Sequence, residues 1–233
     1  MKVAKFGGSS LADAPQIRKV CKIIMDDPAR RVIVVSAPGK AATDDIKVTD
    51  MLIATATATI DGGISAGTPP MEAIIARYAK IADDLGVPDV MNEIAPALRS
   101  LLPLSETMPP ARFMDVMKAA GEDNCARLVA ACLTAMGAPA VYVNPGETGM
   151  VLTSDFGNAQ VCSQTFELLP KSLSKISEIV VFPGFFGRTE EGEIVTFPRG
   201  GSDITGAILT AALKADVYEN FTDVDYVYSV NPK

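Results

Sequence analysis

Two glycine-rich segments, each beginning with a basic residue, are the parts of the sequence best suited to binding anions. Residues 5–10 (KFGGSS) follow a strand-like apolar run, and residues 199–203 (RGGSD) precede a helical pattern. Glycines let backbone N–H groups approach an anion closely, and a helix amino terminus adds about half a positive charge. The two loops together suit a substrate with several negative groups, such as ATP with an acidic co-substrate, whereas two unrelated structural turns are the alternative.

Acidic side chains lie in or near such loops. Asp203 would repel a phosphate unless a cation intervenes, so Mg²⁺ is expected. Glu122, in a GED stretch between two predicted helices, is either a helix N-terminal carboxylate or an acid that binds an ammonium group. Residues 222–225 (TDVD) end a predicted strand and form either a polar ligand site or an ordinary turn. The DFG tripeptide at residues 155–157 copies a protein-kinase metal motif, but the accompanying kinase motifs are absent, so it is interpreted as coincidence.

Composition excludes several classes of function. The chain has no histidine, which removes Ser/His/Asp and Cys/His triads and imidazole metal ligands. Its net charge of −7 disfavours nucleic acid as the main partner. The four cysteines form no CxxC pair and are typical of buried thiols in a reducing compartment. No signal-like leader and no apolar run of ~18 residues occurs, so we expect a cytoplasmic protein without a membrane span.

Alternating strand and helix patterns predict the elements that position these loops. Strands are expected at residues 2–6, 31–36, 140–143, 178–183, 194–197 and 216–222. The order predicts an α/β fold, a doubly wound and mainly parallel sheet. Residues 47–137 interrupt the alternation and are expected to form a helical insertion over the ligand-binding end of the sheet. Its helices are expected at about residues 48–60, 71–85, 89–101, 110–119 and 123–136.

Five segments in order resemble the aspartate kinases of the amino acid kinase family. They are residues 5–10, 35–40, 182–185, 199–203 and 222–225. The resemblance implies a three-layer αβα sandwich in which residues 1–233 form the catalytic domain. It also implies ATP-dependent phosphorylation of L-aspartate to 4-phospho-L-aspartate, a kinase step towards lysine, threonine and methionine. An acetylglutamate, glutamate or uridylate kinase and a non-catalytic binding or regulatory protein of the same fold are the alternatives.

The resemblance also implies roles for individual residues. Lys5 would neutralise the transferring phosphoryl group, and Asp203 would organise that lysine and the metal. Mg²⁺ would travel with ATP, with Asp203 the only candidate protein ligand. The implied nucleotide-binding residues are Lys5, Gly7, Gly8, Ser9, Thr222, Asp223, Tyr228 and Lys233. The implied aspartate-binding residues are Thr49, Glu122, Arg199 and Ser202, with Arg199 on the α-carboxylate and Glu122 on the α-ammonium.

Two features depart from the family pattern. Tyr226 stands where the family usually has glycine, and residues 231–233 (NPK) replace the usual Asp-Pro-Arg. Aspartate kinases also normally continue into the rest of the kinase domain and into regulatory ACT domains. The chain is therefore expected to be a C-terminally truncated catalytic domain, and the intact enzyme is expected to be a homodimer.

Overall fold

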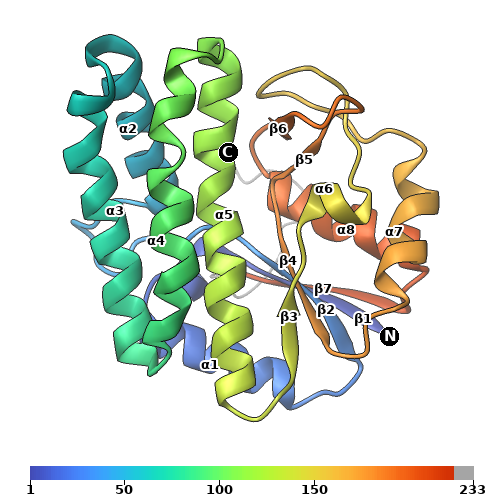
Figure 1. The fold of residues 1–233 in the computed structure, drawn as a ribbon. Helices are drawn as coiled ribbons and strands as arrows, with labels where there is room; N and C mark the ends of the chain where they lie inside the picture. The colour runs from blue at the N-terminus through green and yellow to red at the C-terminus, as the bar shows by residue number, and fades with distance from the viewer. Residues whose placement is uncertain (223–233) are drawn as a thin grey trace, which may run out of the picture.

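A parallel sheet forms the centre of the computed structural model, which describes residues 1–222 (Figure 1). Its strand order is β3-β4-β2-β1-β7, and every neighbouring pair is parallel. The strands are β1 (Lys2–Phe6), β2 (Arg30–Val35), β3 (Ala140–Tyr142), β4 (Ile179–Pro183) and β7 (Val217–Phe221). The predicted mainly parallel α/β sheet is confirmed.

Helices cover both faces of this sheet. One face carries α1 (Ala14–Met25), α2 (Val48–Gly62), α3 (Ile64–Leu85), α4 (Met91–Arg99) and α5 (Pro110–Ala135). The other carries α7 (Thr165–Leu173) and α8 (Gly201–Leu213). The shorter elements are α6 (Pro145–Thr148) and the 3₁₀ turns Gly8–Leu11, Pro88–Val90 and Leu102–Glu106. The arrangement is the three-layer αβα sandwich that the resemblance to the aspartate kinases implies.

Strand alternation decides which helices each side chain meets. Successive residues of a strand point to opposite faces. Ala4 and Phe6 of β1 pack in the core under α1 and α5, whereas Val3 packs in the core under α7 and α8. Lys5 therefore points to the α8 face at the carboxyl end of its strand.

Helix α5 corrects one expectation. It runs without a break from Pro110 to Ala135, so the predicted gap at residues 120–122 does not exist and Glu122 is not at a helix amino terminus. Gly121 is present because the helix packs directly on the loop after β2, where a Cβ would lie 2.8 Å from the Ala37 Cβ. The glycine marks a close contact, and the sequence pattern mistook it for a helix end.

Two further expectations differ from the structure. The predicted strand at residues 194–197 appears as β6 (Ile194–Thr196), but it pairs antiparallel with β5 (Phe186–Arg188) in a separate two-stranded sheet. The sequence did not predict β5, because three residues that include a glycine carry too little pattern. Helix α3 starts seven residues earlier than predicted and contains Pro69 and Pro70 in its first half. No helix of the described part of the chain is long and apolar enough to cross a membrane.

Candidate active site

Four strands of the sheet end at the same level, which brings the predicted loops to one edge. Phe6 pairs with both Val35 and Phe221, and Val35 pairs with Pro183. Just beyond, the Ser36 N–H donates to the Phe6 carbonyl at 3.2 Å, and the Gly184 N–H to the Val35 carbonyl at 2.9 Å. The loops after β1, β2, β4 and β7 therefore meet at the carboxyl edge, where open α/β sheets bind ligands.

A lysine and an aspartate form an ion pair at this edge. Lys5 is 7% exposed, and its Nζ lies 2.8 Å from Oδ1 of Asp203 in the first turn of α8. The Asn220 side chain donates a hydrogen bond to the same oxygen at 3.0 Å. The Asp203 side chain remains 47% exposed, so the ion pair borders solvent. The ion pair thus fixes the Lys5 ammonium group at the carboxyl edge of the sheet.

The first glycine loop packs backbone to backbone on the loop after β2. The Gly39 N–H donates to the Gly8 carbonyl at 2.8 Å, and a Cβ on Gly8 would lie 2.9 Å from the Ala37 carbonyl oxygen. Within the described residues, no acceptor meets the N–H groups of Gly8 and Ser9. A Cβ on Gly7 would lie 3.8 Å from the Lys5 Nζ. Two donors and a lysine therefore lie close together.

The helix expected directly after this loop begins later. A single 3₁₀ turn, Gly8–Leu11, follows Gly7, and α1 starts at Ala14. Asp13 caps α1 by accepting a hydrogen bond from the Gln16 N–H at 2.9 Å. The α1 dipole is therefore not directed from the loop itself, and any anion there depends on the lysine and the free amides.

The second glycine loop does open directly into a helix, as predicted. Gly200, with φ of +87°, is the residue before α8, and Ser202 is buried in its first turn. Ser202 packs against Gly184, where a Cβ would lie 2.6 Å from the serine Oγ. Arg199 is exposed, and none of the described residues offers it a hydrogen bond or an ion pair. Its guanidinium remains available for a ligand.

Glu122 is buried in the middle of α5, and none of the described residues supplies a countercharge. It is 6% exposed, and its Oε2 has no hydrogen-bond partner in the described part of the protein. Burial raises the pKa of Glu122 to about 8, an effect that the backbone amides of Ala37 and of Glu122 itself partly offset. A buried carboxyl with an unused oxygen is suited to receive a cation.

Thr49 lies near the loop after β2, the loop that packs against Gly8. It is half-buried in the first turn of α2, whose start is held by a 3.0 Å hydrogen bond from the Val48 N–H to the Pro38 carbonyl. Thr222 follows β7 directly and is exposed. Three predicted nucleotide-binding residues, Asp223, Tyr228 and Lys233, lie outside the described residues, as do the departures at Tyr226 and 231–233.

The structure adds two residues that the sequence analysis missed. Asn220 pairs in register with Lys5, and a polar residue inside a strand next to that lysine was the available signal. Arg77 of α3 donates to the Gly39 carbonyl at 2.5 Å and pairs with Asp45 at 2.8 Å. It thereby ties the loop after β2 to the helical layer. No local pattern could have identified Arg77, because its partners lie more than 30 residues away.

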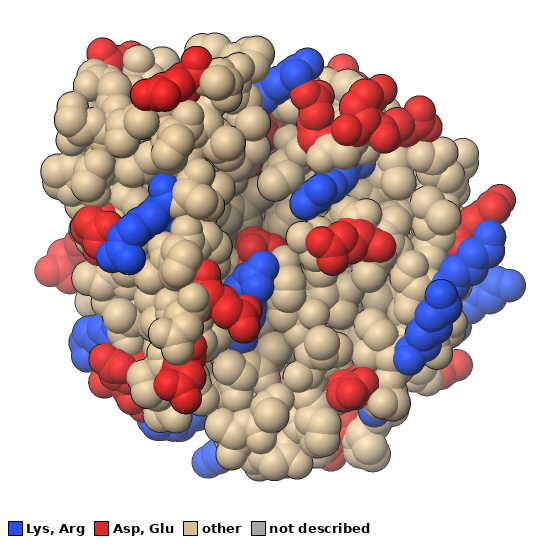
Figure 2. Space-filling view, in the orientation of Figure 1, with Lys and Arg blue, Asp and Glu red and all other residues tan. Residues whose placement is uncertain are grey.

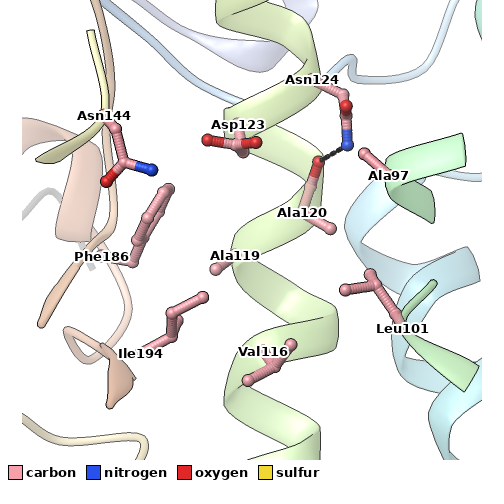
Figure 3. Close-up of a pocket in the computed structure, with 10 residues that line it drawn as sticks. All are labelled: Ala97, Leu101, Val116, Ala119, Ala120, Asp123, Asn124, Asn144, Phe186 and Ile194. Atoms are coloured by element: carbon pink, nitrogen blue, oxygen red, sulfur yellow. Dashed lines mark hydrogen bonds between the residues drawn. The ribbon is translucent and has the colours of Figure 1, made fainter. Parts of the chain in front are cut away.

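A separate small cavity of about 90 Å³ lies beside α5 (Figure 3). Val116, Ala119 and Asp123 of α5 face Phe186 and Ile194 across it. The same face of the molecule is hollowed between the helical layer and the β5–β6 region (Figure 2). None of the predicted site residues that the structure describes lines this cavity, so it is distinct from the edge that carries Lys5.

Comparisons with known proteins identify aspartokinases as relatives of this chain. The chain is 47% identical to aspartokinase 3 of Bacillus subtilis (strain 168) over its full length, which covers 50% of that protein. It is 30% identical to the aspartokinase of Mycolicibacterium smegmatis, covering 99% of this chain and 43% of the relative. The chain therefore spans about half the length of the curated relatives that it matches.

Solved structures agree with these relatives. Escherichia coli aspartokinase III in complex with aspartate and ADP (R-state) matches with a TM-score of 0.80 at 27% identity, covering 96% of this chain and 49% of that one. The same enzyme in complex with lysine and aspartate (T-state) matches equally well. The profile of the Amino acid kinase family matches residues 1–233. The chain belongs to the amino acid kinase family.

Proposed function

We propose that the protein to which this chain belongs transfers the γ-phosphoryl group of ATP to the side-chain carboxylate of L-aspartate. The observation that carries this proposal is the Lys5–Asp203 ion pair at the carboxyl edge of the sheet, between two glycine loops. The relatives named aspartokinase, and the E. coli structure described as a complex with aspartate and ADP, support it.

The nucleotide phosphates fit the first loop. The Gly8 and Ser9 amides have no acceptor within the described chain, and Lys5 supplies a fixed charge beside them. In the transfer, a carboxylate oxygen of aspartate attacks the γ-phosphorus and the bond to the bridging oxygen of ADP breaks. Positive charge at the moving phosphoryl group then lowers the barrier. The acceptor is already ionised, so no general base is required and the lack of histidine is no obstacle.

The proposal also includes Mg²⁺ as the metal that accompanies ATP. Within the described residues, no three Asp, Glu or Cys side chains come together to hold a metal ion. Asp203 is already paired with Lys5. We propose that the nucleotide phosphates hold Mg²⁺, which would neutralise charge during transfer.

The amino acid fits the other groups of the site. Arg199 offers a free guanidinium for the α-carboxylate, and the unpartnered Oε2 of Glu122 offers an acceptor for the α-ammonium. Ser202 and Thr49 are hydroxyl donors near the two loops. We also propose a cytoplasmic location, supported by four free cysteines, which are typical of a reducing compartment.

Trapping the product tests the proposal. The full-length protein, incubated with Mg-ATP, L-aspartate and hydroxylamine, should form aspartyl hydroxamate, since an acyl phosphate reacts with hydroxylamine. Product with glutamate or acetylglutamate but not with aspartate would assign the site to another member of the family. If neither ATP nor aspartate binds in calorimetry, the fold serves a non-catalytic role.

A further inference from the structure

Asp115 is a buried acid that the proposed chemistry does not use. It lies in α5, is 1% exposed, and both of its carboxylate oxygens have partners. Its Oδ2 accepts hydrogen bonds from the Gly157 N–H at 2.7 Å and from the Thr196 N–H at 2.8 Å. Its Oδ1 lies 2.7 Å from the Nζ of Lys118. One side chain therefore joins α5, the DFG loop and strand β6.

The lysine of this cluster strengthens the link to β6. Besides its pair with Asp115, the Lys118 Nζ donates to the Thr196 Oγ1 at 3.2 Å and lies 6.0 Å from the centre of the Phe185 ring. Both the backbone and the side chain of Thr196 are thus held by α5. Burying a carboxylate is costly unless its oxygens have hydrogen-bond or ion-pair partners. Moving β6 away from α5 would remove these partners, so the cluster holds the two elements together.

The residues after Thr196 lead directly to Arg199. The next residue, Phe197, donates its N–H to the Phe185 carbonyl at 2.9 Å. A Cβ on Gly201 would lie 2.8 Å from the Phe197 Cβ, so Phe197 packs directly on the start of α8. Arg199 lies between these two anchored points, while its own side chain has no partner within the described structure. The position of the Arg199 backbone is therefore set by Phe197 and Gly201 on either side of it.

Helix α5 also carries Glu122, seven residues beyond Asp115. Two turns of helix separate the two acids by about 10 Å along a rigid axis. Near the start of α5, Asp115 thus holds the segment that leads to Arg199. Two turns further along the same helix lies Glu122, the acid proposed for the ammonium group. Any shift of β6 relative to α5 would change the distance between Arg199 and Glu122, the two residues proposed to bind the amino acid.

We infer that Asp115 is a positioning residue for aspartate binding: by anchoring Thr196 and Gly157 to α5, it fixes Arg199 at the spacing from Glu122 that the amino acid requires. This inference rests on the proposed function. It also gives the DFG loop a structural use, because Gly157, with φ of +78°, presents the N–H that Asp115 accepts. The last residue of the tripeptide thus donates a hydrogen bond to Asp115, and this structural role requires no metal.

The test is a double-mutant cycle in the full-length protein. Asp115→Asn should raise the aspartate KM about tenfold, because one charge-assisted acceptor is lost, and should change the ATP KM less than twofold. In an Arg199→Ala background the same substitution should add less than twofold, since Asp115 acts through Arg199. Phe113→Leu, also buried in α5, is the matched control for packing loss and should leave both KM values unchanged.

A second variant guards against a folding defect. Lys118→Met keeps the two hydrogen bonds that Asp115 accepts from the backbone. It should also raise the aspartate KM, but by a smaller factor than Asp115→Asn does. Parallel increases in both KM values, a full additional effect in the Arg199→Ala background, or an unchanged aspartate KM in a folded Asp115→Asn protein would each overturn the inference. Failure of the wild-type protein to phosphorylate aspartate would instead refute the proposed function and this inference with it.

Discussion

The buried Glu122 carboxyl should make aspartate binding depend on pH. Its pKa in the free protein is about 8, because burial disfavours the ionised form. An ammonium group at the unpartnered Oε2 favours that ionised form, so binding must remove the proton. At pH 7 about one molecule in ten is already ionised, and binding there costs about 1.4 kcal/mol relative to a fully ionised site. Aspartate affinity should therefore rise about tenfold between pH 6 and pH 7 and level off above pH 8.

Isothermal titration calorimetry measures both parts of this prediction. Titrations of the full-length protein at pH 6, 7 and 8 give the affinities, and two buffers of different ionisation enthalpy give the number of protons released. We expect nearly one proton released per aspartate at pH 7. Glu122→Gln should release none, should show no rise in affinity over this range, and should bind aspartate ten- to a hundredfold more weakly at pH 8. ATP binding serves as the control and should change little.

Stability provides an independent measure of the same group. Between the ordinary glutamate pKa of about 4.5 and the folded value of about 8, the folded state holds a proton that the unfolded state has released. The free energy of unfolding should therefore fall as pH rises, by about 1.4 kcal/mol per pH unit from this group alone. Glu122→Gln should lack this contribution and gain stability relative to wild type towards pH 8 in denaturant titrations. Aspartate affinity that is the same at pH 6 and pH 8, with no proton release, would refute the reasoning.

Three other substitutions test the rest of the site. Lys5→Ala should lower kcat by about 10²–10³ with the fold retained in circular dichroism, because it removes the cation proposed to act on the transferring phosphoryl group. Turnover within threefold of wild type would contradict this role. Arg199→Ala should raise the aspartate KM about ten- to a hundredfold and leave the ATP KM nearly unchanged in steady-state kinetics, whereas a rise in the ATP KM alone would assign the arginine to the nucleotide. Gly8→Ala should weaken ATP binding in calorimetry, because the added methyl would lie 2.9 Å from the Ala37 carbonyl and must displace the loop; unchanged affinity would mean that the loop can shift at little cost.

Local patterns predicted the parts of this protein that depend on neighbours in the sequence. Apolar runs placed the strands of the main sheet, and the glycine loops after β1 and before α8 appeared where they were expected. The resemblance to the aspartate kinases implied that Asp203 would organise Lys5, and the structure places the two side chains 2.8 Å apart. Strand alternation and loop chemistry are short-range properties, so they can be seen without the fold.

The tertiary structure alone decided the features that depend on distant contacts. Gly121 looked like a helix end, yet it lies inside α5, where a Cβ would lie only 2.8 Å from the Ala37 Cβ. That packing removes Glu122 from water and raises its pKa, which no pattern around residue 122 reveals. Asp115 drew no prediction from the sequence, because its partners Gly157 and Thr196 lie 42 and 81 residues away. Burial and charge pairing arise from packing between distant segments, so only the folded chain determines them.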